Sequence, residues 1–275
     1  LEHFYGLDRE WHSRLPAMVV RVITLDLGEA RTLRSFKGSR NVTDLVLERL
    51  PYTMLLITTA SVITAVVGLW VGVKLATQVG KPIDRIVSYF SAVSYAMPAW
   101  WAGILMILIF AFELRLLPAG GLYSTPPPEG GLLRFLDLLW HSVLPVVTLV
   151  LVSLGAWIYT VRTMVLNTAQ EFFVTVARAK GLPETRVMRR YIMRVAAPPI
   201  VTNVVLGLAG SLGGAILTET VFNWPGMGRL YYEAVLAADE NVLVALTFMF
   251  TLIYVAVRFL LDVAYLVIDP RIRHS

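Results

Sequence analysis

Five long apolar runs constrain this chain more than any other feature of its sequence. Each run is longer than the roughly 20 residues that a helix needs to cross the hydrocarbon core of a bilayer. Charged residues make up only 16% of the 275 residues, and they collect between the runs, whereas apolar residues make up 57%. We therefore predict an all-α polytopic membrane protein, with spans at about 53–76, 86–112, 141–164, 200–222 and 242–268.

Small residues and a proline within these runs predict how the spans pack and bend. Gly68 and Gly72 have the four-residue spacing that lets two helices approach closely, and Gly210 and Gly214 repeat it. Pro98 lies inside the second run. We predict a kink there, because a proline removes one hydrogen bond of the helix.

The charges between the runs predict which side of the membrane each loop occupies. Segments 77–85 and 162–195 are basic, whereas 113–140 and 223–241 are acidic on balance. Basic loops are retained in the cytoplasm, so we place the first two segments there and the other two outside. Alternating spans then place residues 1–50 outside and the C-terminus in the cytoplasm.

This topology divides the chain into an extracytoplasmic segment, 1–50, and a transmembrane domain, 51–275, whose first span we expect Pro51 to introduce. The chain opens with Leu1, and no signal-like apolar run precedes the first span. We therefore expect a further, N-terminal membrane helix in the complete gene product.

The residue types that carry most enzyme chemistry are missing or scattered. The chain has no cysteine, which excludes disulfides and thiol catalysis. His3, His12, His141 and His274 have no metal-ligand spacing, and the sequence contains neither a serine elbow nor a phosphate-binding loop. We predict a protein that is not an enzyme, with no cofactor or metal of its own. Its net charge of +5 is explained by cytoplasmic loops, without nucleic acid.

Two charged residues, Arg258 and Asp262, lie four positions apart inside the last run. Each would cost roughly 2.5–3.5 kcal/mol at the bilayer centre on insertion scales, so we predict a structural ion pair. A proton relay is the alternative, but the neighbouring spans offer no ionisable residue to continue it. Glu219, at the outer end of its span, could be interfacial.

A polar, basic segment, 171–199, separates the third and fourth runs. Its first residues are compatible with a helix, Gly181 stands where a helix-ending glycine is typical, and Pro183 can begin the next helix. We predict a short helix, a glycine turn and a second helix that ends near Pro198 and Pro199. Because this segment is charged and cytoplasmic, we interpret it as a docking surface for a separate motor protein.

The same segment resembles the cytoplasmic loop of the dipeptide/oligopeptide/nickel group of ABC transporter permeases. The motif V-x-x-A-R-A-K-G-L at 174–182 carries the resemblance, although Tyr191 and Val195 stand where this group usually has His and Asn. Further motifs of the group follow in order: F-Y-G-L-D at 4–8, L-D-L-G at 25–28, E-R-L-P at 48–51, L-L-P-A-G at 116–120, E-T-V-F at 219–222, P-G-M-G-R-L at 225–230 and D-P-R-I-R at 269–273.

The resemblance implies the transmembrane domain of a type I ABC importer. It also implies a second homologous permease, two ATPase subunits that bind ATP and Mg, an external solute-binding protein and surrounding membrane lipid. In such importers a helix of the loop inserts into the ATPase, which assigns the coupling loop to 164–197 here. The residues that carry over are Ala177, Arg178, Ala179, Lys180, Gly181 and Leu182.

The resemblance predicts a permease for di- and oligopeptides in the cell membrane. Oligosaccharides and nickel are alternative substrates within the same group, and the sequence of the spans does not discriminate among them. A membrane receptor or scaffold without transport activity is the alternative from another class.

Overall fold

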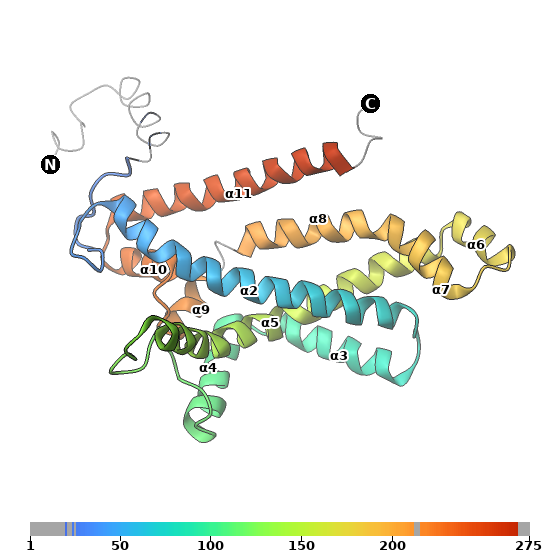
Figure 1. Ribbon diagram of the computed structural model, residues 1–275, viewed down its shortest axis with the longest axis horizontal. Helices are drawn as coiled ribbons and strands as arrows, with labels where there is room; N and C mark the ends of the chain where they lie inside the picture. Colours follow the sequence, from blue (N-terminus) through green and yellow to red (C-terminus); the bar gives the residue numbers. More distant parts are fainter. Residues whose placement is uncertain (1–19, 21–23, 25, 212–214, 269–275) are drawn as a thin grey trace.

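The computed structural model describes residues 20, 24, 26–211 and 215–268. The described chain is almost entirely helical, and its long helices run along one direction while the short ones gather at the two ends (Figure 1). The elements are α2 (Val42–Ala76), α3 (Pro82–Ala96), α4 (Ala99–Met106), the π-helical η1 (Ile107–Glu113), α5 (Gly131–Ala169), α6 (Phe172–Ala179), α7 (Glu184–Val187), the π-helical η2 (Met188–Ile192), α8 (Met193–Ser211), α9 (Ile216–Val221), α10 (Met227–Leu236) and α11 (Glu240–Ile268).

Three helices of the described chain are long and apolar enough to cross a membrane: α2, α5 and the Glu240–Leu260 part of α11. The second predicted run is instead divided into α3 and α4–η1, which are bent by 103° where Met97 and Pro98 separate them. The predicted kink is therefore a break, and this pair is a broken span or a re-entrant loop. The total of five spans stays a prediction.

The prolines predicted to begin or end a helix lie inside helices instead. α2 begins at Val42, so Pro51 lies inside the helix and does not introduce it. α8 likewise continues through Pro198 and Pro199 to Ser211. The predictions at these prolines were wrong because both helices are buried on either side of the proline, at Leu45 and Leu56 and at Ala196 and Ile200. This packing outweighs one lost hydrogen bond.

Two predicted boundaries also differ. α5 begins at Gly131, inside the segment predicted to be an outer loop, and it passes through Pro145. The fourth apolar run is shared between α8 and the short α9. Gly214, and with it the predicted Gly210–Gly214 contact, lies outside the described residues.

Glycines bring α2, α3 and α5 into close contact. A Cβ atom on Gly68 would overlap the ring of Trp157, and one on Gly72 would lie 2.8 Å from side-chain atoms of Val161. The predicted role of this glycine pair is confirmed. On the other side of α5, a Cβ on Gly155 would lie 2.7 Å from the backbone of Ser91 in α3. Because each contact requires a missing side chain, the three helices form a tightly packed unit.

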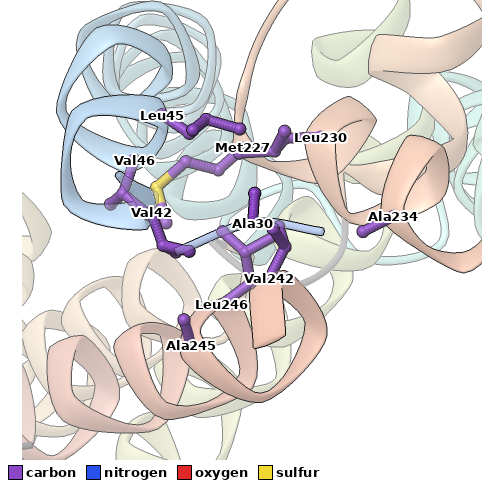
Figure 2. Packing of buried hydrophobic residues seen from close by; sticks show 10 residues of the cluster. All are labelled: Ala30, Val42, Leu45, Val46, Met227, Leu230, Ala234, Val242, Ala245 and Leu246. Atoms are coloured by element: carbon purple, nitrogen blue, oxygen red, sulfur yellow. The ribbon is translucent and has the colours of Figure 1, made fainter. Parts of the chain in front are cut away.

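The segment before α2 folds back onto the end formed by α10 and α11. The N–H of Ala30 donates to the carbonyl of Arg40 (2.7 Å), and the N–H of Val42 donates to the carbonyl of Gly28 (3.0 Å), which closes residues 28–42 into a hairpin-like loop. Figure 2 shows the apolar residues that join this loop to α2, α10 and α11: Ala30, Val42, Leu45, Val46, Met227, Leu230, Ala234, Val242, Ala245 and Leu246.

The loops sort to the two ends of the molecule by charge. α6, α7 and the turn between α2 and α3 lie at one end, which we call the basic end (Figure 1). The hairpin-like loop, the segment between η1 and α5, and the α9–α10 region lie at the other, which we call the outer end (Figure 1). This is the grouping that the charge distribution predicts, with the basic end in the cytoplasm.

Candidate functional site

The segment between α5 and α8 forms the predicted helix, glycine turn and second helix. The N–H of Lys180 donates to the carbonyl of Val176 (3.1 Å), and the N–H of Gly181 donates to that of Arg178 (2.9 Å), which completes the last turn of α6. Gly181 has φ = +74°, a left-handed conformation that glycine adopts with little strain. The prediction of a helix-ending glycine is confirmed.

One face of α6 is buried against α7 and η2, in a cluster that also includes residues of α5 and α8. Val174 is fully buried and Ala177 is 2% exposed, so these positions hold the helix in place instead of meeting a partner. One buried cluster therefore connects α6 to both long helices. The buried cluster consists of Val161, Val165, Val174, Ala177, Val187, Ile192, Ala196 and Ile200, and Leu182 packs against it.

The opposite face of α6 is exposed and partly apolar. Phe172 is 81% exposed and Phe173 is 37% exposed, and Ala179, Lys180 and Gly181 are also exposed. An aromatic side chain as exposed as Phe172 is frequent at protein contact surfaces. These phenylalanines were not among the predicted site residues, although their place at the start of an amphipathic helix could have indicated them.

An ion pair closes the turn. Arg178 Nη2 donates to Glu184 Oε1 (2.6 Å), and its Nε donates to Oε2 (3.1 Å). These hydrogen bonds lower the pKa of Glu184 below its usual range. The pair spans Gly181 and ties the end of α6 to the start of α7. Of the six predicted coupling residues, Ala177 and Leu182 pack inside, Arg178 and Gly181 shape the turn, and Ala179 and Lys180 lie on the surface.

A second ion pair joins α5 to α3 near the same end. Arg162 Nε donates to Asp84 Oδ1 (2.8 Å) and Nη2 donates to Oδ2 (2.9 Å), and the N–H of Gly80 also donates to Asp84 (3.0 Å). Both side chains are mostly buried, with 18% and 8% exposed. The pair links two positions 78 residues apart, and sequence reasoning missed it because no local pattern identifies such a partner.

At the outer end, Glu219 is fully buried and not interfacial. The hydroxyl of Thr53 donates to Oε1 (2.7 Å) and the N–H of Arg229 donates to Oε2 (3.0 Å). Thr53 in turn accepts from the N–H of Met227 (2.7 Å). A Cβ on Gly228 would lie 3.0 Å from Glu219 Oε2, so the glycine leaves space for the carboxylate. Glu219 thus joins α2, α9 and α10.

A second carboxylate, Asp239, holds the hairpin-like loop. It accepts hydrogen bonds from the N–H groups of Thr32 (2.9 Å), Leu33 (3.3 Å) and Val242 (3.4 Å). Burial raises the pKa of Asp239, but these hydrogen bonds favour its charged form more strongly, and the net pKa lies below its usual range.

The predicted ion pair of the last span stays a prediction. Arg258 is exposed on α11, and the side chain of Asp262 lies outside the described residues. Among the residues that the structure describes, no group of three or more His, Cys, Asp or Glu side chains could hold a metal ion.

Comparison with known proteins places the chain in a family. Residues 65–274 match the family described as "Binding-protein-dependent transport system inner membrane component". The di/tripeptide permease protein DppB of Pseudomonas aeruginosa is 31% identical over 99% of this chain and 84% of its own length. DppB of Escherichia coli K12 is 30% identical over 98% and 83%. The oligopeptide permease protein AppB of Bacillus subtilis is 28% identical over 85% and 72%.

Solved structures share the fold. A chain of the MetNI methionine ABC transporter in an inward-facing conformation matches 80% of this chain and 95% of its own length, with a TM-score of 0.60 and 19% identity. A chain of an amino acid ABC transporter crystallised with histidines matches 80% and 92%, with a TM-score of 0.57 and 16% identity. The chain therefore belongs to the family of inner-membrane components of binding-protein-dependent transport systems, with the transmembrane fold of ABC importers.

Proposed function

We propose that this chain is the permease subunit of an ATP-driven importer of di- and oligopeptides that works by alternating access. Support for peptides comes from the relatives, which are named as peptide permeases and align over 98–99% of the chain at 30–31% identity. Within the assembly we propose a second homologous permease, two ATPase subunits and an external solute-binding protein. ATP and Mg bind to the ATPase subunits, because this sequence has no phosphate-binding loop.

The observation that carries the coupling mechanism is the burial of one face of α6 in a cluster that includes two long helices. Val174 and Ala177 share this cluster with Val161 of α5, Ile192 of η2 and Ala196 of α8. The exposed face of α6 is then free to contact the ATPase subunit. When ATP closes the ATPase pair, α6 moves and carries α5 and α8 with it, which shifts the population toward the outward-open state.

The substrate is tested with the complete complex in proteoliposomes that contain ATP inside and the binding protein outside. We expect labelled di- and oligopeptides to accumulate, and unlabelled peptides to compete with them. Accumulation of oligosaccharides or nickel without peptides would contradict the substrate assignment but not the assignment as an importer.

The coupling mechanism is tested by Gly181→Val. A β-branched residue is strained at φ = +74°, although a Cβ there would meet no atom within 4 Å, so the change acts on the turn and not through a clash. We expect uptake to fall by about 5- to 150-fold, as a strain of roughly 1–3 kcal/mol implies, while the complex stays assembled and its ATPase activity persists.

Gly80→Val is the matched control for this variant. Gly80 has φ = +80°, also has open space around it, and lies in the turn between α2 and α3 at the same end. The coupling assignment is wrong if Gly181→Val transports like wild type, or if Gly80→Val uncouples ATPase activity from uptake equally well.

A further inference from the structure

Four arginines gather on one side of the helix that leads from the glycine turn into the membrane. Arg186, Arg190 and Arg194 follow one another at four-residue spacing, with Arg189 beside them, and all four are exposed. Positions three and four apart are neighbours on a helix surface. The opposite side of the same helix carries the buried residues Val187, Ile192, Ala196 and Ile200.

These guanidinium groups have no acidic partner within the described chain. The ion pairs found there involve Arg31, Arg49, Arg162, Arg178, Arg229 and His141, and none involves the four arginines. Neighbouring cations without a counterion repel one another. Their arrangement therefore favours an anion from outside the chain.

Three of the arginines line an open cleft. Arg189, Arg190 and Arg194, together with Met193, surround a space of about 490 Å³ on the surface of η2 and the start of α8. Guanidinium groups bind phosphate oxygens in a bidentate manner. A cleft with three such groups and one apolar side chain fits a phosphate that is attached to an apolar group.

The position of the cleft along the helix favours a lipid as the source of the phosphate. After Arg194, α8 carries no charged residue through Ser211, and Val195 and Val201 are 51% and 54% exposed. The apolar surface thus begins at Val195. At 1.5 Å per residue, Arg190 lies about 8 Å before Val195 and Arg194 about 2 Å before it, whereas the headgroup layer is roughly 5–8 Å thick.

We propose that Arg189, Arg190 and Arg194 form a binding site for the phosphate headgroup of an anionic phospholipid in the cytoplasmic leaflet. The apolar surface beyond Val195 contacts the acyl chains of the same lipid. The site is separate from the exposed face of α6, and it does not depend on which substrate the transporter carries.

The test measures lipid binding to the complete complex in nanodiscs. Native mass spectrometry counts phosphatidylglycerol and phosphatidylcholine bound to the wild-type complex and to the triple variant Arg189→Gln, Arg190→Gln, Arg194→Gln. Each cation near an anionic lipid strengthens binding about fivefold, so we expect the triple variant to bind phosphatidylglycerol about a hundredfold more weakly. Replacing the three arginines with lysine should restore part of this binding, because the charge is kept.

The matched control removes three exposed cations at the outer end with Arg34→Gln, Lys37→Gln and Arg40→Gln, and it should leave phosphatidylglycerol binding unchanged. The proposal is overturned if the wild-type complex does not prefer phosphatidylglycerol to phosphatidylcholine, a result that needs no variant to fold. It is also overturned if free glycerol phosphate at millimolar concentration displaces the lipid. Loss of the ATPase subunits from the triple variant with lipid binding intact would instead assign the arginines to a protein contact.

Discussion

The two ends of this molecule are stabilised in different ways. At the outer end the central groups are fully buried carboxylates, Glu219 and Asp239. Each accepts a hydrogen bond from a distant segment, from the hydroxyl of Thr53 and from the N–H of Thr32 respectively. At the basic end the centre is an apolar cluster around Val174, while most of the charged side chains lie on the surface.

This difference in contacts implies a difference in how easily each end can be displaced. Hydrogen bonds to a buried carboxylate require one geometry, because any displacement leaves a buried polar group without a partner. Apolar contacts have no directional requirement, so helices can shift against one another at lower cost. We therefore expect the outer end to be the more rigid of the two, and the basic end to be the one that shifts.

The largest expected effect is that of Glu219→Ala at the outer end. The substitution removes a buried acceptor and leaves the hydroxyl of Thr53 and the N–H of Arg229 without it. We expect a loss of about 3–5 kcal/mol of stability, measured as a lower melting temperature of the purified complex. Glu240→Ala is the control, since the Glu240 side chain is 70% exposed in its ion pair with Arg31. Equal effects of the two variants would contradict the role of burial.

The second prediction concerns the ion pair that joins α5 to α3 near the basic end, Arg162 with Asp84. Arg162→Leu leaves the 8%-exposed Asp84 without its cation, and we expect a loss of about 3 kcal/mol. The double variant Arg162→Leu, Asp84→Leu should be more stable than the single one, because no lone charge remains. Thermal unfolding of both variants checks this. A double variant that is less stable than Arg162→Leu would contradict this expectation. It would mean that the cost of a lone buried charge is not what makes the single variant unstable.

The third prediction concerns the pH dependence of the outer end. The folded-state pKa of Asp239 is lowered, so its stabilisation is present above the ordinary aspartate pKa of about 4 and is lost as pH falls through the folded-state pKa. We expect the melting temperature of wild type to fall more steeply below about pH 4 than that of Asp239→Asn. Parallel pH profiles would show that Asp239 does not stabilise the hairpin-like loop through its charge.

The smallest expected effect is that of Glu184→Gln in the glycine turn. The Glu184 side chain is 58% exposed and that of Arg178 is 45% exposed, so solvent screens the pair and its loss should cost less than about 1 kcal/mol. We expect an unchanged melting temperature and nearly normal uptake. A loss as large as that of Glu219→Ala would show that the basic end depends on fixed polar geometry after all.

The sequence predicts the features that local chemistry determines. Apolar runs predict α2, α5 and α11, because lipid permits few structures other than a helix. Gly181 predicts the turn, since its left-handed conformation favours glycine, and Gly68 with Gly72 predicts a close helix contact. The exposed cations of the segment between α5 and α8 follow from its composition. These predictions depend only on neighbouring residues.

What the sequence does not predict depends on distant partners. From the sequence, Glu219 could be interfacial, because nothing local indicates that Thr53 and the start of α10 surround it. The Arg162–Asp84 pair requires the packing of α3 on α5, and the break at Met97 and Pro98 becomes a 103° bend only in three dimensions. The early start of α5 at Gly131 was missed because a short amphipathic stretch beside a glycine-rich loop gives no clear boundary.

The length of α5 determines how far one end of the helix is displaced when the helix tilts. Its 39 residues form one uninterrupted helix, about 58 Å long at 1.5 Å per residue, whereas the hydrocarbon core is about 30 Å thick. If its Gly131 end stays in place, a tilt of about 5° displaces the other end of the helix by about 5 Å. Because no joint interrupts α5, a displacement of α6 by this distance would require the whole helix to tilt.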